Sequence, residues 1–163
     1  MLSLFIMLIL FCSCGFLQLQ LPALALFGQV KPPLLLSIVL YYALHHENTK
    51  MYIVAVFVGF LQDALGLIPL GFSSCAFCFV GACVARYRMI LLAESVITRS
   101  FFGAIGAGAV TLIVYLLLVS QSLVQLSLGR LIHKILGAGF YGLIVTPIVC
   151  ECLWRVDNML GNI

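Results

Sequence analysis

Asp63 is the side chain whose chemistry most needs an explanation, because it stands alone among apolar residues. It lies in the stretch from Phe57 to Arg88, which reads FVGFLQDALGLIPLGFSSCAFCFVGACVARYR. A carboxylate taken out of water persists only if it is paired, hydrogen-bonded or protonated, and in membranes such groups often mark a path for ions or protons. A proton path uses a chain of acids, whereas Glu94 and Glu151 fall near the ends of apolar runs. We therefore favour a structural polar clamp over a transport carboxylate.

Other reactive side chains lack the spacing that their chemistry requires. His45–Glu47 is the consecutive run HHE, whereas metal ligands on a helix recur one turn apart, so we expect these residues to be solvated in a loop. Cys75 and Cys78 form a CxxC pair without a second pair at zinc-finger distance. The seven cysteines are expected to pack as small apolar side chains. We predict no catalytic residue, no metal site and no bound cofactor, and hence no enzyme.

The composition is that of an integral membrane protein. Hydrophobic residues make up 64% of the chain, charged residues 8%, and the mean hydropathy is +1.26. Backbone groups inside a bilayer must bond to one another, and these continuously apolar runs fit helices better than alternating barrel strands. The net charge of +3 is scattered, which argues against a nucleic-acid partner. The sequence predicts an all-α fold of a single polytopic domain, residues 1–163.

The apolar runs predict about six transmembrane helices, because a crossing takes about 20 residues. The second run is short: Lys31-Pro32-Pro33 precedes only the apolar residues Leu34 to Leu44, so either residues 23–30 extend a kinked span or the helix is short. Pro69 and Gly71 predict a reversal that turns spans three and four into a helical hairpin. We expect residues 94–99 to form an amphipathic surface segment. The expected spans are residues 2–21, 24–44, 51–68, 70–85, 101–119 and 135–152.

The topology follows from the N-terminal segment and the basic residues. The run from Leu2 to Leu17 followed by Ala23-Leu24-Ala25 is similar to a signal peptide, but Lys and Arg are missing before Lys31, so we expect a retained first helix. A six-span arrangement places five basic residues on one side and three on the other, which favours both termini in the cytoplasm. The five are Lys50, Arg86, Arg88, Arg99 and Arg155, and the three are Lys31, Arg130 and Lys134.

Small residues at helical spacing predict where the helices pack. Ala55 and Gly59 precede Asp63 at intervals of one turn, which places the acid on a packing face that points into the bundle. The pairs Ala104 with Gly108 and Ala138 with Gly142 predict further contacts. Basic groups at the non-cytoplasmic side are expected to neutralise or hydrogen-bond Asp63, since Arg86 lies at the far end of the next helix. These groups are Lys31, Arg130, His133 and Lys134.

Three runs, KPPLLLSIVLYYALHH, GFLQDALGLIPLGFSS and GACVARYR, together resemble the MreD family of bacterial rod shape-determining proteins. That family has a Pro-led, Leu-rich second span, an acid shortly before a Pro-Leu-Gly break, and a Gly-rich stretch that closes on Arg. The resemblance covers about residues 29–88. This chain departs from the family at Lys31-Pro32-Pro33, where Arg-Pro-Asp is frequent. The motif positions are Gly59, Gln62, Asp63, Pro69, Leu70, Gly71 and Arg86.

The resemblance implies a scaffold of the cell-elongation machinery that maintains rod shape by organising sidewall peptidoglycan synthesis. Its implied place is the bacterial cytoplasmic (inner) membrane, and its implied partners are MreC, the MreB filament system, a RodA-type glycosyltransferase and its transpeptidase. The six-helix arrangement is also similar, by family, to the substrate-binding components of energy-coupling factor transporters. The alternative function is therefore a substrate-binding membrane subunit for a vitamin or small solute. Such a subunit needs a pocket with several convergent polar groups, and the sequence supplies few.

Overall fold

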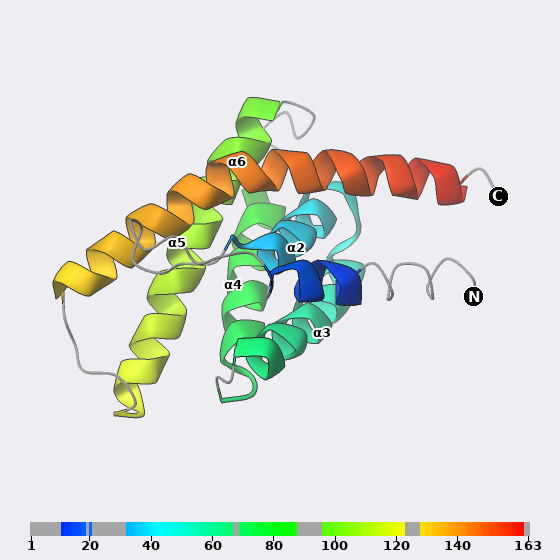
Figure 1. The fold of residues 1–163 in the computed structure, drawn as a ribbon. Helices are drawn as coiled ribbons and strands as arrows, with labels where there is room; N and C mark the ends of the chain where they lie inside the picture. Colours follow the sequence, from blue (N-terminus) through cyan, green and yellow to red (C-terminus); the bar gives the residue numbers. More distant parts are fainter. Residues whose placement is uncertain are drawn as a thin grey trace.

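The computed structural model describes residues 11–18, 20, 32–66, 69–87, 96–122 and 128–161, and within them the regular structure is helical. Residues 11–18 form a short helical segment near the N-terminus. The helices that follow, shown in Figure 1, are α2 (Leu34–His45), α3 (Asn48–Gly66), α4 (Phe72–Tyr87), α5 (Val96–Ser120) and α6 (Leu128–Gly161). The predicted all-α fold is confirmed for this part of the chain.

Helix α2 is the centre of the bundle. It is only 12 residues long, and every residue from Leu35 to Leu44 is buried. It contacts α3, α4, α5 and α6. A helix that is apolar on all sides has no polar face to turn toward water, so enclosure by its neighbours stabilises it. Helix α2 is short within the described part of the chain. Residues 21–31 lie outside that part, so the alternative of a kinked span extended by residues 23–30 stays untested.

Helices α3 and α4 form the predicted hairpin. Helix α3 ends at Gly66 and α4 begins at Phe72, so the reversal lies at the Pro-Leu-Gly break, as the sequence indicated. Gly71 has a φ of 103°, a left-handed conformation that a residue without Cβ adopts at little cost. The two helices then pack along their length. The turn therefore sets the register in which α3 and α4 face one another.

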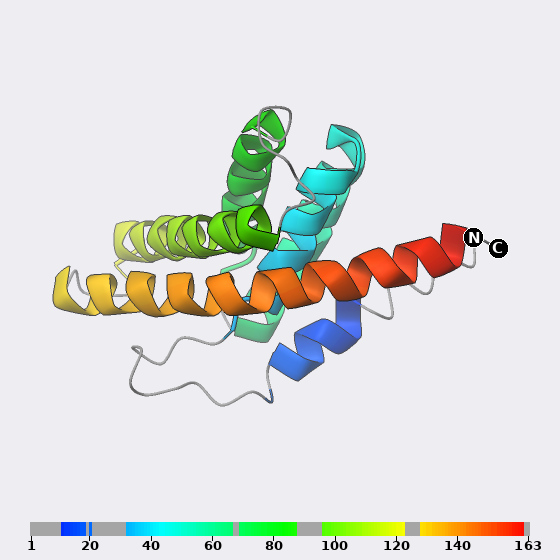
Figure 2. The same ribbon diagram turned by 90° about the horizontal axis from the view of Figure 1, so that it is seen from above.

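Helices α5 and α6 are longer than the spans predicted for them. Helix α5 begins at Val96, so residues 96–99 are helical and not a separate surface segment, and Arg99 is buried. Helix α6 has 34 residues, about 51 Å at 1.5 Å per residue, and it contains Pro147. Proline removes a helix hydrogen bond and is a common cause of bends. Figure 1 shows α6 rising beside α5 and then bending to run past α2, and Figure 2 shows α5 and α6 side by side from above.

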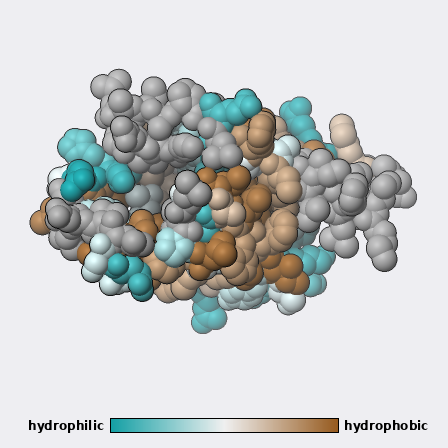
Figure 3. All heavy atoms as spheres, turned by 60° about the horizontal axis from the view of Figure 1, so that its bottom comes forward, coloured by the Kyte–Doolittle hydropathy of each residue, from teal (hydrophilic) through white to brown (hydrophobic). Residues whose placement is uncertain are grey.

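The described helices fit a membrane protein. By length and composition, three of them can cross a bilayer, namely Asn48–Gly66, Val96–Ser120 and Leu128–Met159, while α2 and α4 are shorter apolar helices. Figure 3 shows hydrophobic side chains gathered over the middle of one face and hydrophilic ones nearer its edges. The structure thus supports an all-helical membrane protein, and the count of six crossings stays a prediction.

Candidate functional site

The carboxylate of Asp63 is completely buried and caps helix α4 from the end of α3. Its exposed fraction is 0%. Oδ2 accepts a hydrogen bond from the backbone N–H of Gly71 at 2.7 Å, and the N–H of Ser73 donates to Oδ1 at 3.0 Å and to Oδ2 at 3.2 Å. The first N–H groups of a helix have no partner within it and carry partial positive charge. Asp63 therefore meets its compensating charge in the main chain of the next helix.

The turn residues bring these amides to the acid. Pro69 and Leu70 form the exposed tip of the turn, and the left-handed Gly71 follows. The carbonyl of Gly71 then accepts the first helical bond of α4, from the N–H of Cys75 at 2.9 Å. The predicted motif positions Pro69, Leu70 and Gly71 thus form one turn, which leads directly into the start of α4. Their role here is to aim backbone donors at Asp63.

Gly59 lies one turn before Asp63, at a close approach of α3 to α4. A Cβ placed on Gly59 would overlap the backbone of Ser74. The hydroxyl of Ser74 donates to the carbonyl of Val56 at 3.1 Å, which ties the two helices at the same level. The predicted packing face of Ala55, Gly59 and Asp63 is confirmed, since all three are buried. The close approach of the two helices at Gly59 and the cap at Asp63 therefore lie on successive turns of α3, and both hold α3 against α4.

The prediction that a basic side chain pairs with Asp63 is wrong for the described residues. The ion pairs among them join His46 with Asp157, Arg99 with Glu151 and Arg155 with Glu151, and Asp63 belongs to none. Arg130 and His133 are exposed on α6, and Lys31 lies outside the described part. Arg86 lies in the last turn of α4, at the end opposite the cap, as predicted. Among the described residues, backbone donors bind Asp63 in place of the expected side-chain cation. The part of the prediction that concerns Lys31 stays untested.

Gln62, the neighbour of Asp63, joins a second polar contact that the sequence did not indicate. Its Oε1 accepts from Nε2 of Gln18 at 3.0 Å, and Oε1 of Gln18 accepts from the backbone N–H of Leu35 at 3.2 Å. Gln18 therefore caps the start of α2 while it binds α3. The pair borders a cavity of about 190 Å³.

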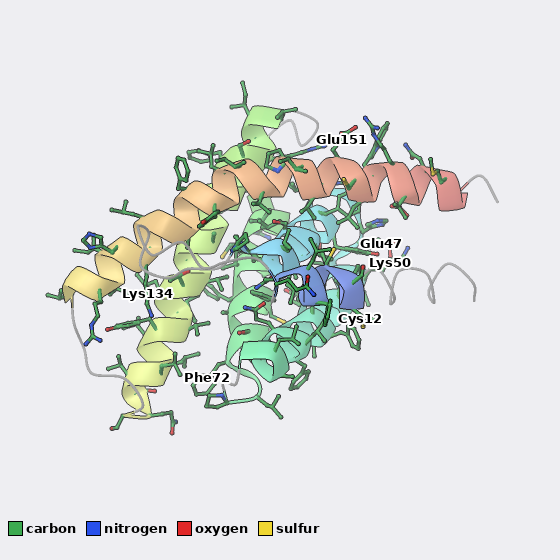
Figure 4. All side chains as sticks on the ribbon, in the orientation of Figure 1. Cys12, Glu47, Lys50, Phe72, Lys134 and Glu151 are labelled. Carbon is green, nitrogen blue, oxygen red and sulfur yellow. The ribbon has the colours of Figure 1, made fainter. Side chains whose placement is uncertain are left out.

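A polar cluster lies at the other end of the bundle. The hydroxyl of Tyr41 donates to Oδ2 of Asp157 at 3.0 Å, and Nε2 of His46 lies 3.0 Å from the same oxygen. The rings of His45 and His46 stack on those of the two tyrosines, each with a centroid distance of 4.7 Å. Loop solvation of these histidines was therefore a wrong prediction. Figure 4 shows Phe72, the first residue of α4, and Glu151, near this cluster, at opposite ends of the molecule.

Arginine and glutamate extend this cluster to α5. Nη1 of Arg99 lies 3.7 Å from Oε2 of Glu151, and Nε of Arg155 donates to Oε1 of the same acid at 3.2 Å. Nη2 of Arg99 lies 3.5 Å from Nε2 of His45. The charged side chains of α5 and α6 thus compensate one another, and Arg99 also contacts His45 at the end of α2. A buried arginine at a helix start needs such partners, because an uncompensated charge is costly away from water.

A second close helix crossing joins α5 to α6 at Gly103 and Gly142. A Cβ on Gly103 would overlap Thr146 and the carbonyl of Gly142, and a Cβ on Gly142 would overlap the carbonyl of Gly103. The hydroxyl of Thr146 lies 3.2 Å from that of Ser37 on α2. Gly142 was among the predicted packing residues, and its neighbour Gly103 was not. The predicted pair on α5 also faces α6: Gly108 lies opposite Ile135, and the carbonyl of Ala104 lies opposite Gly139. Small residues set this contact as they do the first.

Comparison with models of known protein families gives a match. The sequence model of the rod shape-determining protein MreD family matches residues 1–154. The searches of curated proteins and of solved structures find no match.

Proposed function

Because the chain belongs to the rod shape-determining protein MreD family, we propose that it is a six-helix scaffold that organises sidewall peptidoglycan synthesis. Membership gives it a role in rod-shape determination as a structural protein of the inner membrane, in a machinery that includes other Mre proteins. The proposal adds the partners: MreC, the MreB filament system, a RodA-type glycosyltransferase and its transpeptidase. It also adds a multi-pass topology with both termini in the cytoplasm, and the absence of catalysis.

The observation that supports the scaffold proposal is the set of backbone hydrogen bonds that Asp63 accepts. Both oxygens of its carboxylate accept backbone hydrogen bonds at the start of α4, and the group is 0% exposed. An acid in a transport path must exchange protons or ions, which requires access and a partner that changes. An acid bonded to main-chain amides of a tight turn instead fixes two helices. This favours a rigid platform with helix faces for the single membrane helix of a partner.

The rival, a vitamin- or solute-binding transport subunit, has weaker support. Pockets for drug-sized ligands usually measure about 300–1,000 Å³ and converge several polar groups. The cavity beside Gln62 measures about 190 Å³ and has Gln18, Gln62 and Thr111 as its polar lining. We therefore propose a similarity to the substrate-binding components of energy-coupling factor transporters in helix arrangement only, and not in function.

Complementation and co-purification test the proposal together. A strain depleted of the native protein is supplied with the wild type, Asp63→Leu, or the control Glu47→Gln, which changes an exposed acid. We expect the wild type and the control to restore rods and to recover MreC from solubilised membranes. Asp63→Leu should give rounded cells and lose MreC, because α4 loses its cap.

The opposite results are equally specific. Recovery of an ATP-binding transport module with a bound vitamin would support the rival. Normal rods and normal MreC recovery with Asp63→Leu, at wild-type protein levels, would refute the scaffold role of the cap.

A further inference from the structure

The cavity beside the Gln18 and Gln62 pair is bounded by residues 11–18 and by α2, α3, α4 and α5. The described lining residues are all uncharged: the two glutamines and Thr111 are polar, and the walls are apolar and include Leu36, Phe77 and Val110. A dry apolar cavity of about 150 Å³ is enough to take up a benzene ring. The volume of about 190 Å³ therefore has room for one small apolar group together with a polar atom.

The hydrogen bonds fix which polar atom the cavity offers. A backbone N–H can only donate, so the atom of Gln18 that faces Leu35 at 3.2 Å is its oxygen. The NH2 group of Gln18 must then donate to the oxygen of Gln62, at 3.0 Å. This assignment leaves the NH2 group of Gln62 without a partner among the described residues. The hydroxyl of Thr111 is already engaged, since it donates to the carbonyl of Ala107 at 2.8 Å.

The free group is thus a donor on an uncharged lining, and its natural complement is an uncharged acceptor such as a carbonyl. An anion would find no cation among the lining residues that the structure describes. Gln62 lies four residues before Gly66, about 6 Å inside the end of α3 at 1.5 Å per residue. The interface of a bilayer adds about 5–7 Å per leaflet to the hydrocarbon core. At that depth the abundant carbonyls are the ester groups of glycerolipids.

We propose that this cavity binds a glycerolipid, with an ester carbonyl on the NH2 group of Gln62 and the first part of an acyl chain against Leu36, Phe77 and Val110. Leu36 and Phe77 are each 2% exposed, so bulk lipid around the bundle does not reach them. A bound chain would fill the space between α2 and α4 beside the Asp63 cap. The lipid then acts as a structural part of the bundle and not as a transported solute.

Photolabelling in vesicles tests the proposal. The full-length protein is reconstituted into vesicles of phosphatidylethanolamine and phosphatidylglycerol. A trace of the phosphatidylglycerol is ester-linked and carries a diazirine on the part of its acyl chain nearest the ester. Adducts are mapped by mass spectrometry after irradiation. We expect adducts on Leu36 and Phe77 as well as on the exposed, lipid-facing Ile105. Unlabelled ester lipid should compete for the two buried positions about fivefold better than its ether analogue, the factor that one net hydrogen bond contributes.

Two variants test separately the NH2 donor of Gln62 and the volume of the cavity. Gln62→Leu should bring the ester-to-ether ratio to about one, whereas the control Gln121→Leu, at an exposed amide, should leave it unchanged. Val110→Phe fills the cavity and should abolish adducts on Leu36 and Phe77 while those on Ile105 persist, provided that the helix content matches the wild type. The proposal is overturned if wild-type protein carries no adducts at the buried positions, or if ester and ether lipids compete equally.

Discussion

Replacing Asp63 by asparagine is the most informative single change, because it keeps the shape of the side chain and removes its charge. The carboxylate accepts from two backbone N–H groups, at 2.7 Å and 3.0 Å. Asparagine retains one acceptor and places an NH2 group where the second oxygen was. One charge-assisted hydrogen bond is lost, worth about 1.5–3 kcal/mol, and a buried donor then faces another donor. We expect the free energy of unfolding to fall by about 3 kcal/mol.

The assay is denaturant titration in detergent micelles, followed by the helical circular dichroism signal. Lys134→Gln is the matched comparison, since this half-exposed lysine was a predicted partner of the acid. A change away from the described contacts alters stability by about 0.5 kcal/mol or less. Equal losses for Asp63→Asn and Lys134→Gln would mean that an ion pair, and not the start of α4, holds the acid. No loss for Asp63→Asn would refute the cap altogether.

Three further substitutions probe the helix contacts in the same assay. Gly59→Ala should cost about 1–3 kcal/mol, because the new Cβ overlaps the backbone of α4, whereas Gly129→Ala, which meets open space, should be neutral or stabilising; equal effects would contradict the close crossing. Gly71→Ala should cost about 1–2 kcal/mol because φ is 103°, and an unchanged midpoint would show a different turn. Tyr41→Phe should cost about 1 kcal/mol through the lost bond to Asp157, and the same substitution in an Asp157→Ala background should cost nothing.

The sequence predicts the parts of this structure that depend on neighbouring residues. Proline and glycine fix backbone angles locally, so the reversal between α3 and α4 lies where Pro69 and Gly71 place it. Helical spacing likewise puts Gly59 and Asp63 on one buried face. Both inferences need only the geometry of a single helix or turn.

The partners of the polar side chains could not be predicted in this way. Main-chain N–H groups are present at every residue except proline, so the sequence does not reveal which of them Asp63 accepts from. His46 meets Asp157, 111 residues later in the chain and beyond the span predicted to end at residue 152. Gln18 reaches Gln62 and the start of α2 only after three helices have assembled. Each of these contacts depends on tertiary packing.

The way Asp63 is compensated has a consequence for the conditions under which the hairpin holds. Ions in solution screen charges at the protein surface over about 8 Å at physiological ionic strength, and weaken exposed ion pairs accordingly. The carboxylate of Asp63 is 0% exposed, and its donors belong to the adjoining turn of the same polypeptide. Salt screens a buried contact of this kind much less than an exposed ion pair. The contact between Asp63 and the start of α4 should therefore stabilise the hairpin equally at low and at high salt concentration.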